Sequence, residues 1–168
     1  MKTKEWLGAS LGVALLGVLG FAWLSDTGMK VAPEVSMKLI GGEQLSIDSL
    51  RGRPVMVTFW ATTCTACRKE IPHLKEIYET YSSQGFEMIA VAMPYDPPAQ
   101  VWEFMKQKTL PYKVALDTDG AVTKAFGTIR LTPTTFVISG DGQIVYNAPG
   151  EFDLAKMHGL VKTLLADA

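Results

Sequence analysis

The sequence predicts an α/β domain with a mixed central sheet and helices on both of its faces. Two compact apolar runs, Val55–Trp60 and residues 86–92, are typical of strands buried on both sides. A helical pattern follows each run, the first between Cys67 and Gly85 and the second over Pro98–Lys108. A strand pair and a last amphipathic helix come after them, so parallel and antiparallel neighbours are both expected.

The remaining elements are short and are separated by turn signals. Gly41-Gly42 separates the first two strands and predicts an N-terminal hairpin, and Ser139-Gly140-Asp141-Gly142 separates the last two. These elements are, in chain order, strands at 35–40 and 44–47, a strand near 114–116, a helix at 121–126, strands at Thr134–Ile138 and 144–146, and a helix at 154–165.

Length and charge set the class of protein. A chain of 168 residues is one ordinary domain with an appendage. The net charge is −1, from 16 basic and 17 acidic residues, and no basic stripe runs along any predicted element. We therefore expect no nucleic acid as a partner.

The appendage is an uncharged, apolar stretch at the N-terminus. Residues 6–24 nearly span a hydrocarbon core of ~30 Å as a helix, and Lys2 and Lys4 precede them. This predicts a single transmembrane helix, with the N-terminus on the cytoplasmic side of the membrane and the rest of the chain exported. A cleaved signal peptide is the alternative. The predicted division is an anchor at 1–24, a linker at 25–34 and a domain at 35–168.

Both cysteines of the chain lie in one motif, Cys64-Thr65-Ala66-Cys67, between a strand and a helix. Cys64 is then expected at a helix N-terminus, where the helix dipole and free N–H groups stabilise a thiolate. The spacing predicts two-step exchange: Cys64 attacks a partner disulfide, and Cys67 resolves the mixed disulfide. Run backwards, the same pair oxidises a dithiol.

Other uses of a C-x-x-C motif fit the sequence less well. A zinc site needs four ligands, usually in Cys/Cys or Cys/His sets, and the only histidines are His73 and His158, of which His73 lies about 180° round the helix from Cys64. Haem attachment requires a histidine after Cys67, where Arg68 stands. An inert structural disulfide remains an alternative. We expect no metal and no cofactor beyond the redox-active Cys64–Cys67 disulfide.

Three further motifs carry a family resemblance. They are Phe59-Trp60-Ala61 ahead of the cysteines, the run Cys67-Arg68-Lys69-Glu70-Ile71-Pro72, and Leu131-Thr132-Pro133-Thr134-Thr135-Phe136. With them, residues 35–168 resemble the membrane-tethered TlpA/ResA-type thiol–disulfide oxidoreductases of the thioredoxin fold. The resemblance implies a cis Thr132–Pro133 bond facing the cysteines, with Thr132 pairing to a client strand. It implies that Trp60 lines the site or belongs to the core.

The chain departs from the family pattern beside the cysteines. Thr63 stands where the family usually has tryptophan, and Thr58 where thioredoxin keeps a buried aspartate as proton acceptor for the second cysteine. Proton transfer then needs water or another carboxylate. Asp96 is one candidate, because ResA-type proteins place a glutamate in that loop; helix N-capping is its alternative. Glu70 is the other candidate, although on the helix we expect a surface or packing role.

The resemblance also implies partners and a direction of electron flow. We expect a reductase of disulfide- or thiol-containing client proteins, such as those of cytochrome c maturation, that is recharged by a transmembrane thiol relay of the DsbD or CcdA kind. A disulfide oxidase or isomerase of the same fold is the alternative. A peroxiredoxin-type peroxidase lacks its required motif, since Val57 and Ala61 occupy the key positions. A non-catalytic peptide-binding module remains a third reading.

Overall fold

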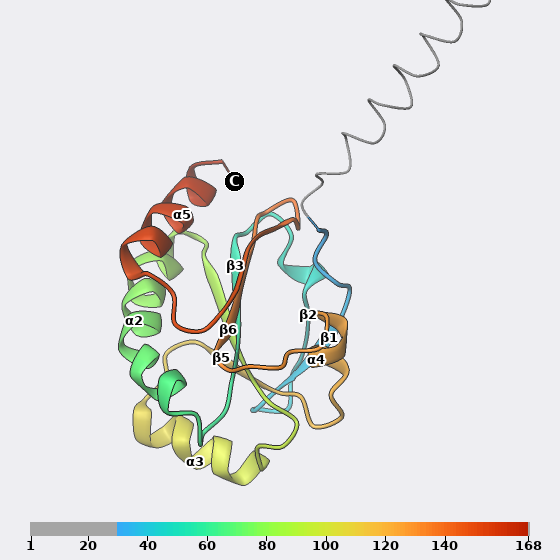
Figure 1. The fold of residues 1–168 in the computed structure, drawn as a ribbon. Helices are drawn as coiled ribbons and strands as arrows, with labels where there is room; N and C mark the ends of the chain where they lie inside the picture. The colour runs from blue at the N-terminus through green and yellow to red at the C-terminus, as the bar shows by residue number, and fades with distance from the viewer. Residues whose placement is uncertain (1–29, 168) are drawn as a thin grey trace, which may run out of the picture.

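The computed structural model describes residues 30–167, which form a seven-stranded sheet in the order β2-β1-β5-β4-β3-β6-β7 (Figure 1). β3, β4 and β5 are parallel to one another, whereas β1, β2, β6 and β7 pair antiparallel with their neighbours. The predicted mixed sheet is thereby confirmed. The strands are β1 Ser36–Leu39, β2 Gln44–Ser46, β3 Val55–Trp60, β4 Glu87–Ala92, β5 Lys113–Leu116, β6 Thr134–Ile138 and β7 Ile144–Pro149.

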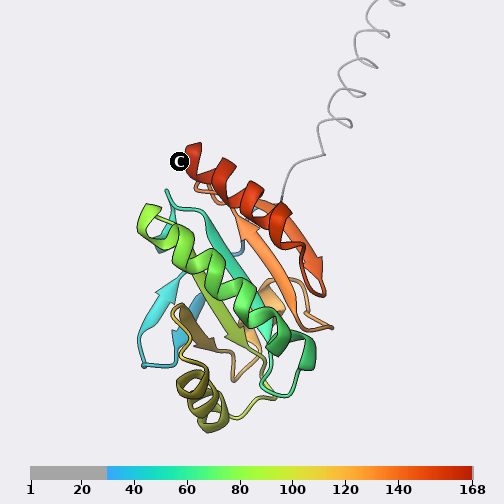
Figure 2. The same ribbon diagram turned by 90° about the vertical axis from the view of Figure 1, so that its left-hand side faces the viewer.

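Helices cover both faces of the sheet, as the sequence predicts. α2 and α5 lie across one face, and α4 lies on the other (Figures 1 and 2). The 3-10 helix η1 was not predicted, because three residues carry no periodic pattern. The helices are α2 Thr65–Tyr81, α3 Pro98–Lys108, α4 Ala121–Ala125 and α5 Leu154–Ala166, with the 3-10 turns η1 Asp48–Leu50 and η2 Ser82–Gln84.

The central strand β3 divides the core into two layers, because its side chains alternate between the faces of the sheet. Met56 and Trp60 pack in the layer that contains α2, α3 and α5. Val57 and Phe59 pack in the layer that contains α4 and η1. Trp60 is the last residue of β3, so the chain leaves the sheet between the two layers and enters the cysteine motif.

The folded domain begins earlier than the predicted boundary at residue 35. Val31 forms an antiparallel bridge with Gln143, and the N–H of Ala32 donates to the carbonyl of Gly142 at 2.9 Å. Ala32 is buried in the layer beside α4. Residues 30–32, predicted as part of the linker, therefore belong to the folded domain, because their backbone groups pair with residues 142–144 at the β6–β7 turn.

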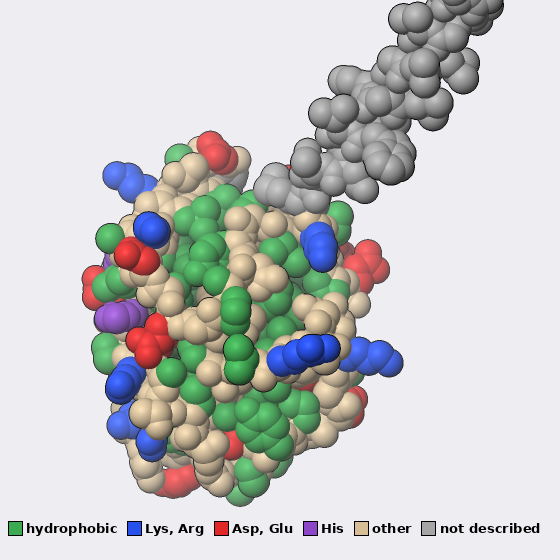
Figure 3. Space-filling model, in the orientation of Figure 1, with side chains coloured by type: hydrophobic (Ala, Val, Ile, Leu, Met, Phe, Trp, Pro, Cys, Tyr) green, Lys and Arg blue, Asp and Glu red, His purple; other side chains and the backbone are tan. Residues whose placement is uncertain are grey.

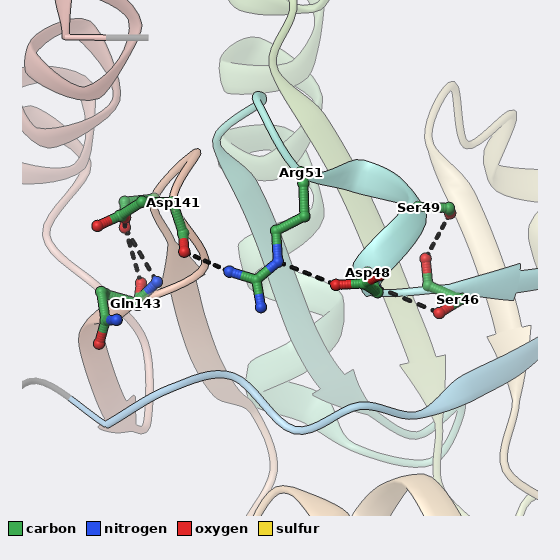
Figure 4. Close-up of polar contacts among 7 residues, drawn as sticks. Ser46, Asp48, Ser49, Arg51, Asp141 and Gln143 are labelled. Carbon is green, nitrogen blue, oxygen red and sulfur yellow. Dashed lines mark hydrogen bonds and ion pairs between the residues drawn. The ribbon is translucent and has the colours of Figure 1, made fainter.

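Arg51 ties this end of the sheet together (Figure 4). Its guanidinium donates to the backbone carbonyl of Asp141 in the β6–β7 turn, and to Asp48 in η1 at 3.1 Å. Arg51 thus connects the β6–β7 turn, which pairs with residues 30–32, to η1, which precedes β3. Among residues 30–167, no helix is long and apolar enough to cross a bilayer, and the predicted span 6–24 lies outside this range.

Candidate active site

The two cysteines form a disulfide at the N-terminus of α2, with their Cα atoms 5.3 Å apart. Cys64 is the N-cap of the helix, and its Sγ accepts a hydrogen bond from the N–H of Cys67 at 3.1 Å. Cys64 is half-buried, whereas Cys67 is buried. The geometry fits the predicted roles, because the attacking sulfur must reach a client while the resolving sulfur needs only to reach Cys64.

The loop before β6 faces the same sulfur. The Thr132–Pro133 peptide bond is cis, and the carbonyl oxygen of Thr132 lies 3.4 Å from Cys64 Sγ. A disulfide sulfur carries no hydrogen, so in this oxidised state the approach is a contact, whereas the Cys64 thiol can donate to this oxygen after reduction. A backbone hydrogen bond also fixes Pro133, because its carbonyl accepts from the N–H of Gly150 at 2.7 Å.

A small cavity lies under Cys67 on the α2 side of the sheet. Glu70, one turn along α2 from Cys67, lines it with a side chain that is 1% exposed. The residues around it are Thr58, Trp60, Cys67, Glu70, Ile71, Leu74, Ala90, Leu110 and Tyr112. A carboxyl group is thereby placed in the same enclosed space as the resolving cysteine.

The protein environment disfavours the charged form of the Glu70 carboxyl group. Burial raises the pKa of its carboxyl from 4.5 to about 7, although the N–H of Phe152 donates to its Oε1 at 3.1 Å and opposes the shift. Nearby Glu151 raises the pKa further. Burial, with Glu70 adding to it, also raises the pKa of Tyr112. Near neutral pH, Glu70 can therefore take up and release a proton.

Of the surface or packing role expected for Glu70, the surface position is wrong, because the side chain is buried. The buried stripe of α2 consists of Cys67, Glu70, Ile71, Leu74, Ile77 and Tyr81. Glu70 lies on that stripe between Cys67 and Leu74 and therefore points into the core.

Asp96 is also buried, but it serves another part of the site. Its two carboxylate oxygens accept from the N–H and from the hydroxyl of Thr62, each at 2.6 Å. Gln100 donates to the same hydroxyl at 2.6 Å. Asp96 does not line the cavity under Cys67, and α3 has Pro97 as its N-cap with no side-chain cap. Asp96 instead fixes the loop that leads into Cys64, a role that no local sequence pattern indicates.

Trp60 lies in the core next to Cys67. It is 5% exposed, and its ring packs against Phe104 of α3 with the centroids 5.3 Å apart. Of the two readings of Trp60, the core reading describes its surroundings, and its ring also lines the cavity under Cys67.

The surroundings of the site contain exposed apolar side chains and no assembled metal site. Tyr95 in the β4–α3 loop and Leu131 in the loop before Pro133 are more than half exposed. Charges of both signs are interspersed on the face shown in Figure 3, with apolar side chains between them. No group of three or more His, Cys, Asp or Glu side chains within residues 30–167 is arranged to hold a metal ion.

Comparison with known proteins assigns the chain to a family. Residues 26–161 match the Redoxin family. ResA thiol-disulfide oxidoreductase from Bacillus subtilis strain 168 is 34% identical over 127 residues, which are 76% of this chain and 70% of ResA. The chain belongs to the Redoxin family. Within it, this Redoxin protein is a thiol–disulfide oxidoreductase of the ResA type, with the Cys64–Cys67 disulfide as its redox group.

Solved structures agree with this assignment. A thioredoxin-family thiol:disulfide interchange protein from Chlorobium tepidum TLS superposes with a TM-score of 0.74 at 30% identity, covering 82% of this Redoxin protein and 97% of that chain. StoA from Bacillus subtilis gives a TM-score of 0.66 at 26% identity, covering 77% and 96% of the two chains. The thioredoxin-like fold expected from the three motifs is confirmed.

Proposed function

We propose that this oxidoreductase reduces disulfides in exported client proteins while it is tethered to the bacterial inner membrane. The observation that carries the proposal is the division of labour between the two cysteines. Cys64 is partly accessible beside Thr132, and buried Cys67 shares a cavity with Glu70, a carboxyl whose pKa is about 7. An inert structural disulfide needs neither arrangement.

The reaction passes two electrons from the cysteine pair to the client. The Cys64 thiolate attacks one client sulfur, a mixed disulfide forms, and the other client sulfur leaves as a thiolate. Cys67 then loses its proton to Glu70 and attacks Cys64 Sγ. The Cys64–Cys67 disulfide forms, the mixed disulfide breaks, and the second client thiolate leaves. The client disulfide is reduced as the pair is oxidised.

The place where the chain enters the domain supports a tether that leaves the site free. Residues 30–32 pair with the β6–β7 turn, whereas Cys64 follows the opposite end of β3, which runs antiparallel to β6 (Figure 1). An anchor at 6–24 would thus hold the domain by the end far from the disulfide. Clients would approach from the aqueous side.

The proposed partners follow from this position. Clients would be exported proteins with cysteines that must stay reduced, such as apocytochromes c, and a transmembrane thiol relay of the DsbD or CcdA kind would return electrons to the pair. Thr132 would pair with an extended client segment by main-chain hydrogen bonds.

The reduction potential of the Cys64/Cys67 pair tests the direction of flow. Full-length protein in mild detergent is equilibrated against dithiol buffers of known potential, and the reduced fraction is read by thiol alkylation. Potentials of this fold run from about −270 mV in thioredoxin to about −120 mV in DsbA. We expect a value toward the lower end. A value near that of DsbA would make the protein an oxidase or isomerase instead.

A further inference from the structure

Two buried side-chain polar atoms have no hydrogen-bond partner among residues 30–167, and both belong to residues that line the cavity under Cys67. They are the indole Nε1 of Trp60 and the Oε2 of Glu70. Buried polar groups are rarely left unpaired, because losing water without a replacement partner is unfavourable. Two such atoms on residues that line one cavity point to a shared partner.

A small molecule that both accepts and donates hydrogen bonds could bridge the two atoms. The indole N–H of Trp60 only donates a hydrogen bond, and an ionised Glu70 oxygen only accepts one. Since a water molecule does both, one water placed between them can pair with each atom. The cavity has room for about one water molecule. The volume open to the centre of a water molecule is about 10 Å³.

Two more polar groups line the same cavity, and they complete the surroundings of such a water. Cys67 is one, and Thr58, at the position of thioredoxin's buried aspartate, is the other. Thr58 Oγ1 lies 3.0 Å from Thr135 Oγ1, which leaves the Thr58 hydroxyl with hydrogen-bonding capacity to spare. A buried water needs two to four polar partners, and the cavity supplies four groups of this kind.

We propose that Trp60 is a positioning residue whose indole N–H holds one water molecule between Cys67 and Glu70, and that the proton of Cys67 reaches Glu70 through this water. The inference rests on the proposed function, in which Cys67 resolves the mixed disulfide and Glu70 takes its proton. Trp60 contributes orientation only and neither gains nor loses a proton.

The step balances as a two-proton relay. The water oxygen accepts hydrogen bonds from the Trp60 N–H and the Cys67 S–H, and one of its own hydrogens points to Glu70 Oε2. The S–H bond breaks as an O–H bond forms on the water, and the water gives another proton to Glu70. The water is regenerated and Glu70 becomes neutral. The electron pair left on Cys67 forms the bond to Cys64 Sγ, and the client thiolate leaves with its own pair.

Stopped-flow reaction of the reduced full-length protein with 5,5′-dithiobis(2-nitrobenzoate) separates the two steps. Attack by Cys64 releases one coloured thiolate, and resolution by Cys67 releases a second. We expect Trp60→Phe, which removes the N–H but keeps an aromatic ring, to slow the second release by about tenfold or more, and Glu70→Gln to do the same. We expect the double variant to match the slower single variant within about twofold, because both changes break one relay.

Phe104→Leu is the matched control. Phe104 packs against the Trp60 ring but does not line the cavity, so this change disturbs the packing of Trp60 without removing its N–H. We expect the second release to stay within about twofold of the wild-type rate. A slowing by Phe104→Leu equal to that by Trp60→Phe, or additive effects of Trp60→Phe and Glu70→Gln, would show that Trp60 acts through packing alone and would overturn the proposal.

A second measurement needs no variant at position 60 to fold. In mixtures of H₂O and D₂O, a relay through water moves two protons in the resolution step, so a plot of its rate against deuterium fraction is curved, whereas direct transfer gives a straight line. A straight line would sink the relay. An unchanged second release in Glu70→Gln would instead remove Glu70 as acceptor, and so identify a failure of the proposed function rather than of the water site.

Discussion

The raised pKa of Glu70 affects the stability of the fold. Its pKa is about 7 in the folded protein and 4.5 without the fold's influence. Between these values the folded state keeps a proton that the unfolded state has lost, so stability falls as pH rises. A shift of this size corresponds to about 3 kcal/mol, which is present below pH 4.5 and lost above pH 7.

We therefore expect Glu70→Gln to flatten the pH dependence of stability. Glutamine has no charge to bury, and its amide oxygen can still accept from the N–H of Phe152. The difference in unfolding free energy between the variant and wild type should grow in favour of the variant by up to about 3 kcal/mol from pH 4.5 to pH 8, measured by urea denaturation of the oxidised protein. Glu79→Gln, exposed on the same helix, is the control. A difference that stays constant with pH would contradict the raised pKa.

At the scale of elements, Asp96 joins the β4–α3 loop to the loop ahead of α2. We expect Asp96→Asn to destabilise the protein by about 1–3 kcal/mol, because the amide replaces one oxygen that accepts from Thr62 with a second donor. The first thiolate release with 5,5′-dithiobis(2-nitrobenzoate) should also slow, because Thr62 lies in the loop that positions Cys64. Urea denaturation and stopped-flow mixing measure the two effects, and a variant with wild-type values in both would show that this link is dispensable.

At the other end of the sheet, Arg51 joins η1 to the β6–β7 turn. We expect Arg51→Ala to lower the unfolding free energy by about 1 kcal/mol, because a partly exposed guanidinium adds only modestly through its ion pair and its carbonyl bond. The potential of the cysteine pair should not change, since the site lies at the opposite end of β3. Arg53→Ala, at a neighbouring exposed residue, is the control for the loss of one positive charge.

Some elements of the fold can be predicted from the sequence alone. β3, α3 and β6 have the bounds that were predicted, since local apolar runs and turn signals mark where they begin and end. The burial of Glu70 has a local signal too: Cys67, Glu70, Leu74, Ile77 and Tyr81 follow a 3-4-3-4 spacing, so a charged residue stands on a buried stripe.

Other features of the site depend on contacts between distant parts of the chain. Phe152, which donates to Glu70, lies 82 residues further along, and Thr62 and Asp96 are separated by 34 residues. The strand-like pairing of residues 30–32 likewise depends on the edge of β7, more than 100 residues away. No local pattern encodes such pairs, because the topology of the sheet brings them together. The motifs could place the cysteines and Pro133, but not the residues that support them.

At the scale of the whole molecule, the disulfide and the entry of the chain lie at opposite ends of the sheet, so a client meets the end that carries Leu131. The Leu131 side chain is 65% exposed, while its carbonyl is held by the Thr134 hydroxyl at 2.8 Å. A polar residue there should leave the loop in place and remove only an apolar contact with the client.

We expect Leu131→Ser to lower kcat/KM for reduction of a protein disulfide, such as that of insulin, by roughly tenfold, which corresponds to losing most of one buried leucine contact of about 1.5 kcal/mol. The rate with 5,5′-dithiobis(2-nitrobenzoate) should stay within about twofold of wild type, because this small disulfide has no polypeptide segment to lay against the loop. Val31→Ser removes a comparably exposed apolar side chain, 60% exposed, at the far end of the sheet and should leave both rates unaltered. If Leu131→Ser slowed both substrates equally, the effect would lie in the chemistry of Cys64, and the apolar side chain would have no part in selecting clients.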